Sequence, residues 1–278
     1  MDYTINVSGR LIDLSEPQVM GILNVTPDSF YAESRMQTEE EITKRAGQIL
    51  AEGASMIDVG AFSTRPGAAI VSEEEECARL RLALSLIRRD YPEAVLSIDT
   101  FRPEVAKMVI EEFGDCIIND VGGLTAGANG SLADDPTRRM EMFRLVSRMR
   151  VPYIYMSTAA TLREVLLDFA EKAQILRDLG QKDIILDPGF GFGKTTDQDH
   201  ALMGELEKLQ VMHLPLLVGI SRKSMIWRRL GITPQEALNG TTVLNTVALL
   251  KGADILRVHD VKAAVETVKL VKALNIEH

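Results

Sequence analysis

The sequence has little of several features that mark particular classes of protein. It has only two cysteines, Cys77 and Cys116, whose separation fits neither a disulfide framework nor a cysteine-ligated metal site, so both are predicted to be structural. It has no combination of serine or cysteine with histidine that suggests a nucleophilic triad. The formal net charge of −9 at pH 7 leaves no basic stripe for a phosphate backbone, so nucleic-acid binding is not expected.

Long apolar runs are also missing. No stretch approaches the roughly 18 consecutive apolar residues of a membrane-spanning helix, and residues 1–13 lack the basic start and apolar segment of a secretory signal. We therefore expect a cytoplasmic protein that does not associate with membranes. The 278 residues are 46% hydrophobic, which is enough to bury the core of one large domain, and no linker divides residues 1–278.

Short apolar runs alternate with amphipathic segments along the whole chain. Eight runs are predicted as buried strands, at 19–24, 56–60, 95–99, 116–120, 153–156, 184–187, 216–219 and 255–258. Eight helices are predicted after them, at 39–52, 73–89, 103–112, 136–149, 162–180, 199–209, 241–251 and 260–274. Eight strand–helix repeats in roughly 250 residues predict an α/β fold, a single-domain (β/α)8 TIM barrel. A doubly wound sheet is the alternative.

Polar side chains follow the predicted strands, at the end of a barrel where active sites gather. One set combines carboxylates, an amide and a lysine, which suits a flat polar heterocycle: Asp99, Asn119, Asp187 and Lys223. A second set suits phosphate oxygens, with an amide that can also help to hold Mg²⁺: Asn24, Thr64, Arg65, Arg257 and His259. The residues alone therefore predict a barrel enzyme that acts on a phosphorylated heterocycle.

Two of these features have simpler interpretations. Residues 187–194 place a carboxylate at a strand end and three glycines after it, which predicts a ligand-facing loop but also fits a tight turn with a capping aspartate. Asp58, on the second predicted strand, faces the rim in one interpretation. In the other it only orients neighbouring loops by accepting backbone N–H bonds.

Seven stretches resemble the sequence motifs of the dihydropteroate synthase family. They are 21–30, 63–67, 97–100, 118–120, 187–194, 219–224 and 257–260, and they follow the family order over nearly the whole chain. The resemblance implies a transferase of folate and tetrahydrofolate biosynthesis that sulfonamides inhibit. Such an enzyme condenses 6-hydroxymethyl-7,8-dihydropterin diphosphate with p-aminobenzoate, giving 7,8-dihydropteroate and pyrophosphate.

The resemblance also implies a role for each matching residue. The pterin would contact Asp99, Asn119, Met156, Asp187, Lys223 and Arg257. The diphosphate would contact Asn24, Thr64, Arg65, Arg257 and His259, with Asn24 as the ligand of the metal cofactor Mg²⁺. The aminobenzoate would contact Thr64, Pro66, Phe192, Lys223 and Ser224. The resemblance implies that Lys223, Arg257 and His259 are the catalytic residues and that the diphosphate leaves before the amine attacks. It also implies a homodimer.

Two segments depart from the family pattern. Phe62 follows Gly60-Ala61 where the family more often has two glycines and a polar residue. Residues 155–160 replace a Met-His-Met-Arg/Gln-Gly segment and shorten that loop, although Met156 keeps its place. The loops at 27–38 and 63–71 are expected to close over the reactants and exclude water.

Two alternatives to the synthase follow from the same motifs. The pterin-binding barrel of corrinoid-dependent methyltransferases shares the heterocycle pocket, but it has no need of the diphosphate-binding residues Arg65, Arg257 and His259. A pterin-binding homologue without turnover is the other alternative, suggested by the altered segment 155–160.

Overall fold

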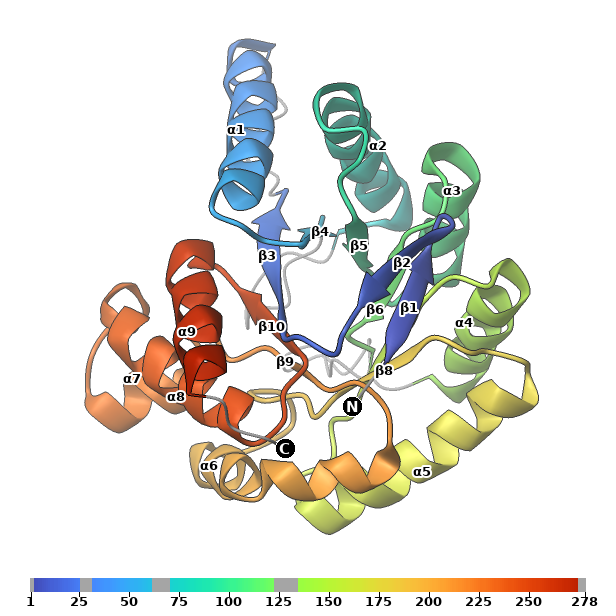
Figure 1. The fold of residues 1–278 in the computed structure, drawn as a ribbon. Helices are drawn as coiled ribbons and strands as arrows, with labels where there is room; N and C mark the ends of the chain where they lie inside the picture. Colours follow the sequence, from blue (N-terminus) through green and yellow to red (C-terminus); the bar gives the residue numbers. More distant parts are fainter. Residues whose placement is uncertain (1–2, 26–31, 62–70, 123–134, 275–278) are drawn as a thin grey trace.

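Eight parallel strands form the centre of the protein, and helices surround them (Figure 1). The computed structural model describes residues 3–25, 32–61, 71–122 and 135–274, with the backbone alone for 32–38. Each strand except the sixth pairs with the next one along the chain, and the last pairs with the first. The ring closes between its sixth and seventh strands through one bridge, from Leu186 to Leu216. This closure confirms the predicted barrel and excludes the doubly wound alternative.

The strands of the barrel are short and buried on both faces, as their branched apolar residues predict. They are β3 (Gln18–Asn24), β4 (Met56–Gly60), β5 (Leu96–Asp99), β6 (Ile117–Asp120), β7 (Tyr153–Met156), β8 (Ile184–Asp187), β9 (Leu217–Val218) and β10 (Ile255–Val258). The bounds of β4, β7, β8 and β10 coincide with the prediction. β9 is shorter than predicted, and at its start the Leu216 N–H donates to the Asp254 carboxylate at 2.7 Å rather than to a neighbouring strand.

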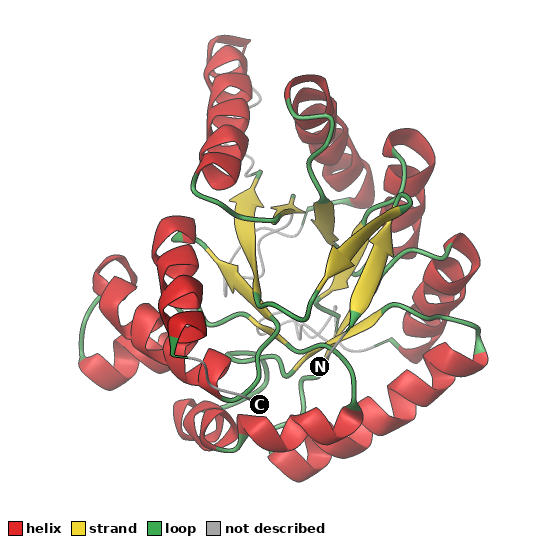
Figure 2. Cartoon of the chain, in the orientation of Figure 1, coloured by secondary structure: helices red, strands yellow, loops and turns green. Residues whose placement is uncertain are grey.

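Nine α-helices and two 3-10 helices lie among the described residues, most of them outside the ring (Figure 2). The α-helices are α1 (Ala32–Ala51), α2 (Glu73–Asp90), α3 (Pro103–Phe113), α4 (Pro136–Met149), α5 (Leu162–Asp178), α6 (Thr196–Gly204), α7 (Ser224–Leu230), α8 (Leu238–Leu250) and α9 (Val261–Ala273). Side-chain caps fix several starts. Ser72 accepts the Glu75 N–H at 3.2 Å before α2, and Thr161 forms a capping box with Glu164 before α5.

The helix predicted at 199–209 was wrong as a continuous element. A capping box between Thr195 and Gln198 starts α6 earlier, at Thr196, and α6 ends at Gly204. The chain then tightens into the 3-10 helix η1 (Leu206–Met212). Helix α7 and the short 3-10 helix η2 (Pro234–Glu236) were not predicted, and α1 begins seven residues before the predicted 39.

An antiparallel hairpin, absent from the prediction, closes the N-terminal end of the barrel (Figure 1). It pairs β1 (Thr4–Val7) with β2 (Arg10–Asp13) through a turn in which Ser8 and Gly9 have φ of 53° and 79°. One hydrophobic cluster contains four residues of this N-terminal segment, Ile5, Val7, Ile12 and Leu14. It also contains residues at or near the starts of the barrel strands: Met20, Met56, Val95, Ile117, Ile154, Ile185, Leu217 and Ile255. We call this hairpin and its cluster the floor of the barrel.

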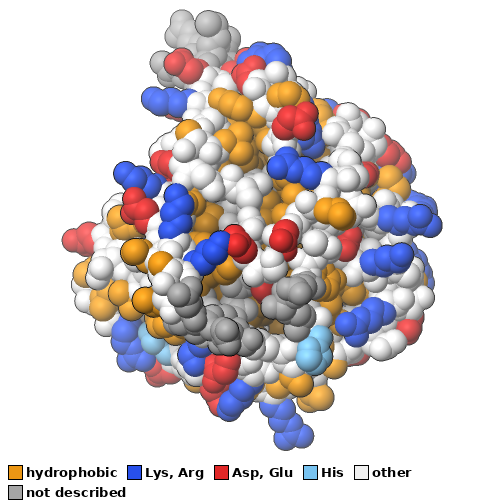
Figure 3. Space-filling model, viewed as in Figure 1, with side chains coloured by type: hydrophobic (Ala, Val, Ile, Leu, Met, Phe, Trp, Pro, Cys, Tyr) orange, Lys and Arg blue, Asp and Glu red, His pale blue; other side chains and the backbone are white. Residues whose placement is uncertain are grey.

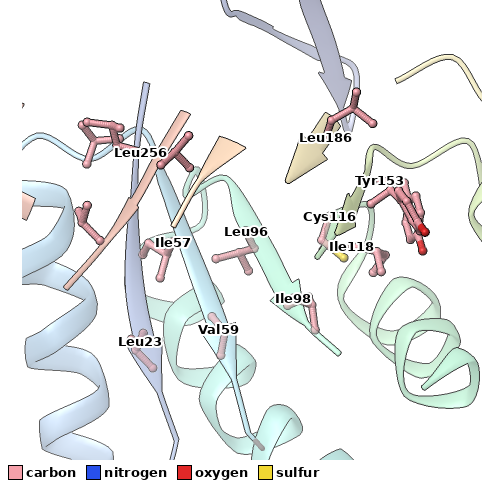
Figure 4. Packing of buried hydrophobic residues seen from close by; sticks show 14 of the residues in the cluster. Leu23, Ile57, Val59, Leu96, Ile98, Cys116, Ile118, Tyr153, Leu186 and Leu256 are labelled. Carbon is pink, nitrogen blue, oxygen red and sulfur yellow. The ribbon is translucent and has the colours of Figure 1, made fainter. Parts of the chain in front are cut away.

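A second hydrophobic core lies between the strands and the helices (Figure 4). Cys116 belongs to it, and burial raises the pKa of its thiol to about 12, as expected of a structural cysteine. On the face shown in Figure 3, Lys and Arg side chains lie among Asp and Glu side chains without forming a continuous basic surface. Within the described ranges, none of the helices combines the length and apolarity needed to cross a membrane.

Candidate active site

The strand register brings three polar residues and a glycine into one layer at the C-terminal rim. Asn24 of β3 lies opposite Gly60 of β4, Gly60 opposite Asp99 of β5, and Asp99 opposite Asn119 of β6. Gly60 contributes no side chain to this layer. A Cβ atom at that position would lie 3.4 Å from Asn24 Oδ1 and 3.5 Å from Asp99 Oδ2. The predicted residues on these three strands therefore gather around one space.

Arg257 of β10 reaches across the rim to two carboxylates. Its Nε donates to Asp58 Oδ2 and its Nη2 to Asp99 Oδ2, both at 2.6 Å. Burial opposes the charge on Arg257, but Asp58 and Asp99 more than offset that effect and raise the pKa of the guanidinium. Burial raises the pKa of Asp99 to about 7, against the attraction of Arg257. The pair therefore combines a fixed cation with a carboxyl group that titrates near neutrality.

Asp58 is fully buried, and side chains from three strands donate to it. Ser97 Oγ lies 2.6 Å from its Oδ1, Arg257 Nε 2.6 Å from its Oδ2, and Asn119 Nδ2 3.3 and 3.2 Å from the two oxygens. The interpretation that Asp58 orients loops through backbone N–H bonds is corrected by this geometry. Asp58 holds the side chains of two predicted pocket residues instead.

Asp187 and Lys223 lie on the opposite side of the rim. The carboxylate of Asp187 is buried and accepts the Gly189 N–H at 2.7 Å. Burial raises the pKa of Asp187, against the opposing effect of Lys223. Burial also lowers the pKa of Lys223 to about 8, against the attraction of Asp187. The Nζ of Lys223 donates to the Phe190 carbonyl and lies 4.3 Å from the centre of the Phe192 ring.

The glycines after β8 are required by close packing as well as by conformation. Gly189, Gly191 and Gly193 have φ of 67°, 77° and 64°, in the left-handed region that other residues avoid. A Cβ at Gly189 would lie 2.1 Å from the Ser157 carbonyl oxygen, and one at Gly193 would lie 2.7 Å from the Thr158 carbonyl oxygen. The altered segment after β7 therefore packs directly against the glycine loop.

Lys194 joins these two segments. Its Nζ lies 3.4 Å from the Ser157 carbonyl oxygen, 3.0 Å from that of Gly189 and 3.3 Å from that of Phe192. Burial lowers the pKa of this ammonium, against the attraction of Asp187. Sequence reasoning included Lys194 in a motif but gave it no role. The available signal was a lysine directly after a loop of three glycines.

The chain that presents Lys223 is itself held in place. Arg222 has φ of 55°, and its guanidinium donates twice to Asp260, at 2.8 and 2.9 Å. Arg222 also donates to the Pro234 carbonyl, whereas Lys223 donates to the Phe190 carbonyl in the glycine loop. Ser224 then begins α7 and is half-buried beside Lys223.

His259 lies at the rim directly after β10. Val258 packs into the outer core, so the alternation of an extended chain puts Arg257 and His259 on the other side. The His259 N–H donates to Ser221 Oγ at 3.1 Å, and its carbonyl accepts from Arg45 Nη2 at 2.6 Å. The backbone of this predicted diphosphate-binding residue is therefore fixed from both sides.

Comparison with known proteins identifies the family. The family described as pterin binding enzyme matches residues 20–259. The dihydropteroate synthase of Escherichia coli K12 is 38% identical over 271 residues, covering 95% of this chain and 94% of that protein. That of Clostridium beijerinckii is 37% identical over 252 residues, covering 87% and 88%. This chain belongs to the dihydropteroate synthase family.

Solved structures of dihydropteroate synthases share the fold as well. The enzyme of Xanthomonas albilineans with 4-aminobenzoic acid gives a TM-score of 0.85 at 32% identity, with both chains fully covered. The enzyme of Coxiella burnetii in complex with pteroic acid gives a TM-score of 0.82 at 30% identity, with 98% of each chain covered.

The structure brings most of the residues predicted from the dihydropteroate synthase motifs to one rim. Asn24, Asp99, Asn119 and Arg257 lie on one side, and Met156, Asp187, Phe192, Lys223 and Ser224 lie on the other. The Cγ of Met156 lies 3.1 Å from the Cβ position of Gly189, so Met156 packs beneath the glycine loop. Thr64, Arg65 and Pro66 lie outside the described residues, as do Phe62 and most of the predicted closing loops.

Proposed function

We propose that this protein is a dihydropteroate synthase of folate biosynthesis. It joins p-aminobenzoate to 6-hydroxymethyl-7,8-dihydropterin diphosphate, giving 7,8-dihydropteroate and pyrophosphate. The observation that carries the proposal is Arg257, a guanidinium held by Asp58 and Asp99 beside other buried polar groups at the rim. A pocket for the heterocycle alone would not require this fixed cation at its mouth.

The buried groups suit the pterin ring. Asp187 and Asn119 offer acceptors for ring N–H groups, and Lys223 offers a donor for a ring carbonyl or nitrogen. Among the described residues Asn119 Oδ1 has no hydrogen-bond partner although it is buried, which supports a ligand at that point. Met156 would supply an apolar contact to one face of the ring.

The cationic groups suit the diphosphate. Arg257 is permanently charged and would bind a phosphate oxygen, and His259, two residues further along the chain, would reach the same group. Thr64 and Arg65 complete this site in the motif-based prediction. The chemical work of these residues is to stabilise negative charge as the diphosphate departs.

The residues beside Asn24 fit a Mg²⁺ ion. Asn24 is exposed at the rim, and its Oδ1 lies across Gly60 from the Asp99 carboxylate, so oxygen atoms of both residues face the position of Gly60. Mg²⁺ prefers oxygen ligands and keeps several waters. When bound there, the ion would add positive charge next to the diphosphate.

The aminobenzoate would lie against Phe192 and Ser224, with Thr64 and Pro66 completing its site. The Lys223 ammonium lies over the Phe192 ring and so fixes that ring beside the pterin pocket. This arrangement would hold the amine for attack on the pterin methylene carbon after the diphosphate leaves. No side-chain nucleophile is required, so the residues contribute by positioning and by electrostatics.

Three further properties belong to the same proposal. The enzyme would be cytoplasmic, and sulfonamides would inhibit it; a Yersinia pestis dihydropteroate synthase 32% identical to this chain has a structure described as a sulfonamide drug complex. It would form a homodimer through α7 and α8, where Leu230, Leu238, Val243 and Leu250 are 39% to 55% exposed. Light scattering of the purified protein would measure its mass in solution.

One experiment tests the function directly. Purified protein is mixed with dihydropterin diphosphate, p-aminobenzoate and Mg²⁺, and dihydropteroate is followed by mass spectrometry beside pyrophosphate release. The proposal expects both products in equal amounts. Pterin binding without either product would instead identify a binding homologue that has lost turnover, and the shortened segment 157–160 would become its suspected cause.

A further inference from the structure

We propose that Asp58 is a positioning residue that fixes the polarity of the pterin pocket. It holds the Asn119 amide with its nitrogen turned inward and its oxygen toward the ligand. Asp58 thereby determines that the pocket presents a hydrogen-bond acceptor at this point and selects a heterocycle with a donor there. The inference rests on the proposed function and adds a specificity-determining contact behind the ligand-binding residues.

The position of Asp58 makes this control possible. It lies two residues before the end of β4, fully buried, with Ile22 of β3 and Ser97 of β5 as its strand partners. A carboxylate at this depth accepts hydrogen bonds and donates none. Its neighbours must therefore all turn donors toward it, as Ser97, Asn119 and Arg257 do.

The amide of Asn119 has one donor end and one acceptor end. Its Nδ2 lies 3.3 and 3.2 Å from the two oxygens of Asp58, so the donor end is used. Turning the amide over would place Oδ1 against the carboxylate, where two acceptors repel each other. The Oδ1 atom is therefore held away from Asp58, buried and without a partner among the described residues.

The same carboxylate also orients the cation at the mouth. Arg257 Nε donates to Asp58 and its Nη2 to Asp99, so two bonds fix the plane of the guanidinium. Asp58 thus links the predicted pterin site to the predicted diphosphate site without occupying either. A residue with a purely structural role would affect folding but not the polarity of the Asn119 amide.

An exchange of the two side chains tests the polarity. Asp58→Asn lets the Asn119 amide turn over, and Asn119→Asp places two carboxylates together. The double variant Asp58→Asn/Asn119→Asp restores a donor facing an acceptor and again leaves an oxygen toward the ligand. Affinity for the free pterin alcohol is measured by calorimetry, which needs no turnover.

Each single variant should bind the alcohol about tenfold more weakly or worse, as for the loss of a charged hydrogen bond. The exchange variant should recover to within about fivefold of the unsubstituted protein. Ser97→Ala is the matched control, because it removes one donor from Asp58 and leaves the Asn119 contact in place, so affinity should hardly change.

Three outcomes separate the claims. An Asp58→Asn protein that binds as tightly as the unsubstituted one, or an exchange variant no better than the singles, overturns the inference. If Asp58→Asn alone does not fold, the exchange variant decides, since it must both fold and bind. Failure of the proposed function shows separately, as unsubstituted protein that binds pterin and releases no pyrophosphate.

Discussion

Arg257 and Asp99 join across the rim at 2.6 Å although 158 residues separate them in the chain. The guanidinium carries its charge at every ordinary pH, whereas burial raises the pKa of Asp99 to about 7. The attraction in this pair therefore depends on whether Asp99 is ionised. On the opposite side of the rim, burial lowers the pKa of Lys223 to about 8.

A bell-shaped pH profile of kcat/KM follows from these two groups. Below about 7 Asp99 takes up a proton and loses its ion pair, and above about 8 Lys223 loses the charge that binds the pterin. Activity should fall on both sides of that window. Initial rates across pH would measure the profile, and Asp99→Asn should shift its acid limb to lower pH. An unchanged acid limb in that variant would contradict the assignment.

Lys194→Met should loosen the contact between the segments after β7 and β8. The variant removes the ammonium group that donates to three backbone carbonyls, and each carbonyl loses that hydrogen bond. We expect Tm to fall by about 3–8 °C and KM for the aminobenzoate to rise, because Phe192 is one of the residues held. Lys208→Met, at an exposed lysine paired with Glu205, is the control and should leave KM unchanged. The same KM for the aminobenzoate in both variants would show that Lys194 does not support the aminobenzoate site.

Gly189→Ala and Gly204→Ala should have opposite effects on stability. Gly189 has φ of 67°, and its added methyl group would lie 2.1 Å from the Ser157 carbonyl oxygen, so the loop must move. Gly204 ends α6 with nothing within 4 Å of its Cβ position, so alanine should stabilise by up to about 0.5–1 kcal/mol. Thermal unfolding measures both. A Gly189→Ala protein with unchanged Tm and pterin affinity would show that the loop tolerates a side chain.

Leu14→Ala should destabilise the protein by about 2–5 kcal/mol, because Leu14 is 1% exposed and packs into the floor. Leu11→Ala is the matched control on β2, since Leu11 is 67% exposed and should change the free energy of unfolding by less than about 0.5 kcal/mol. Urea unfolding of the two variants makes the comparison. Similar losses in both would show that the floor contributes little to stability.

The sequence predicted the barrel because its strands are encoded locally. The runs that form β4, β7, β8 and β10 are continuous and apolar, and each needs only its own residues to be recognised. The hairpin was missed because β1 has only four residues, two of them buried, which is too short for a reliable alternation. The end of α6 at Gly204 was missed because the apolar pattern continues into the 3-10 turn.

The candidate site was predictable from the sequence where a motif marks the end of a strand. It was less predictable where the role of a residue depends on contacts with residues far away in the chain. Asp187 and Lys223 were assigned to the heterocycle site from their own segments, and the structure places both at the rim beside the glycine loop. Their contact with the pterin stays a prediction. The role of Asp58 depends on Asn119 and Arg257, which are 61 and 199 residues away in the chain, and no local pattern reports such a contact. Thr64 and Arg65 remain predictions.

The floor determines how ligands enter and leave the barrel. Because the hairpin and its cluster block one end, every molecule must enter and leave past the rim. Asp187 and Asn119 are buried, whereas Phe192 and Ser224 are half-buried, so a pterin would have to bind before the aminobenzoate, and the joined product would leave as one molecule. A tightly bound aminobenzoate mimic would then block the exit of the bound pterin. Pterin exchange would slow in proportion to the residence time of the mimic.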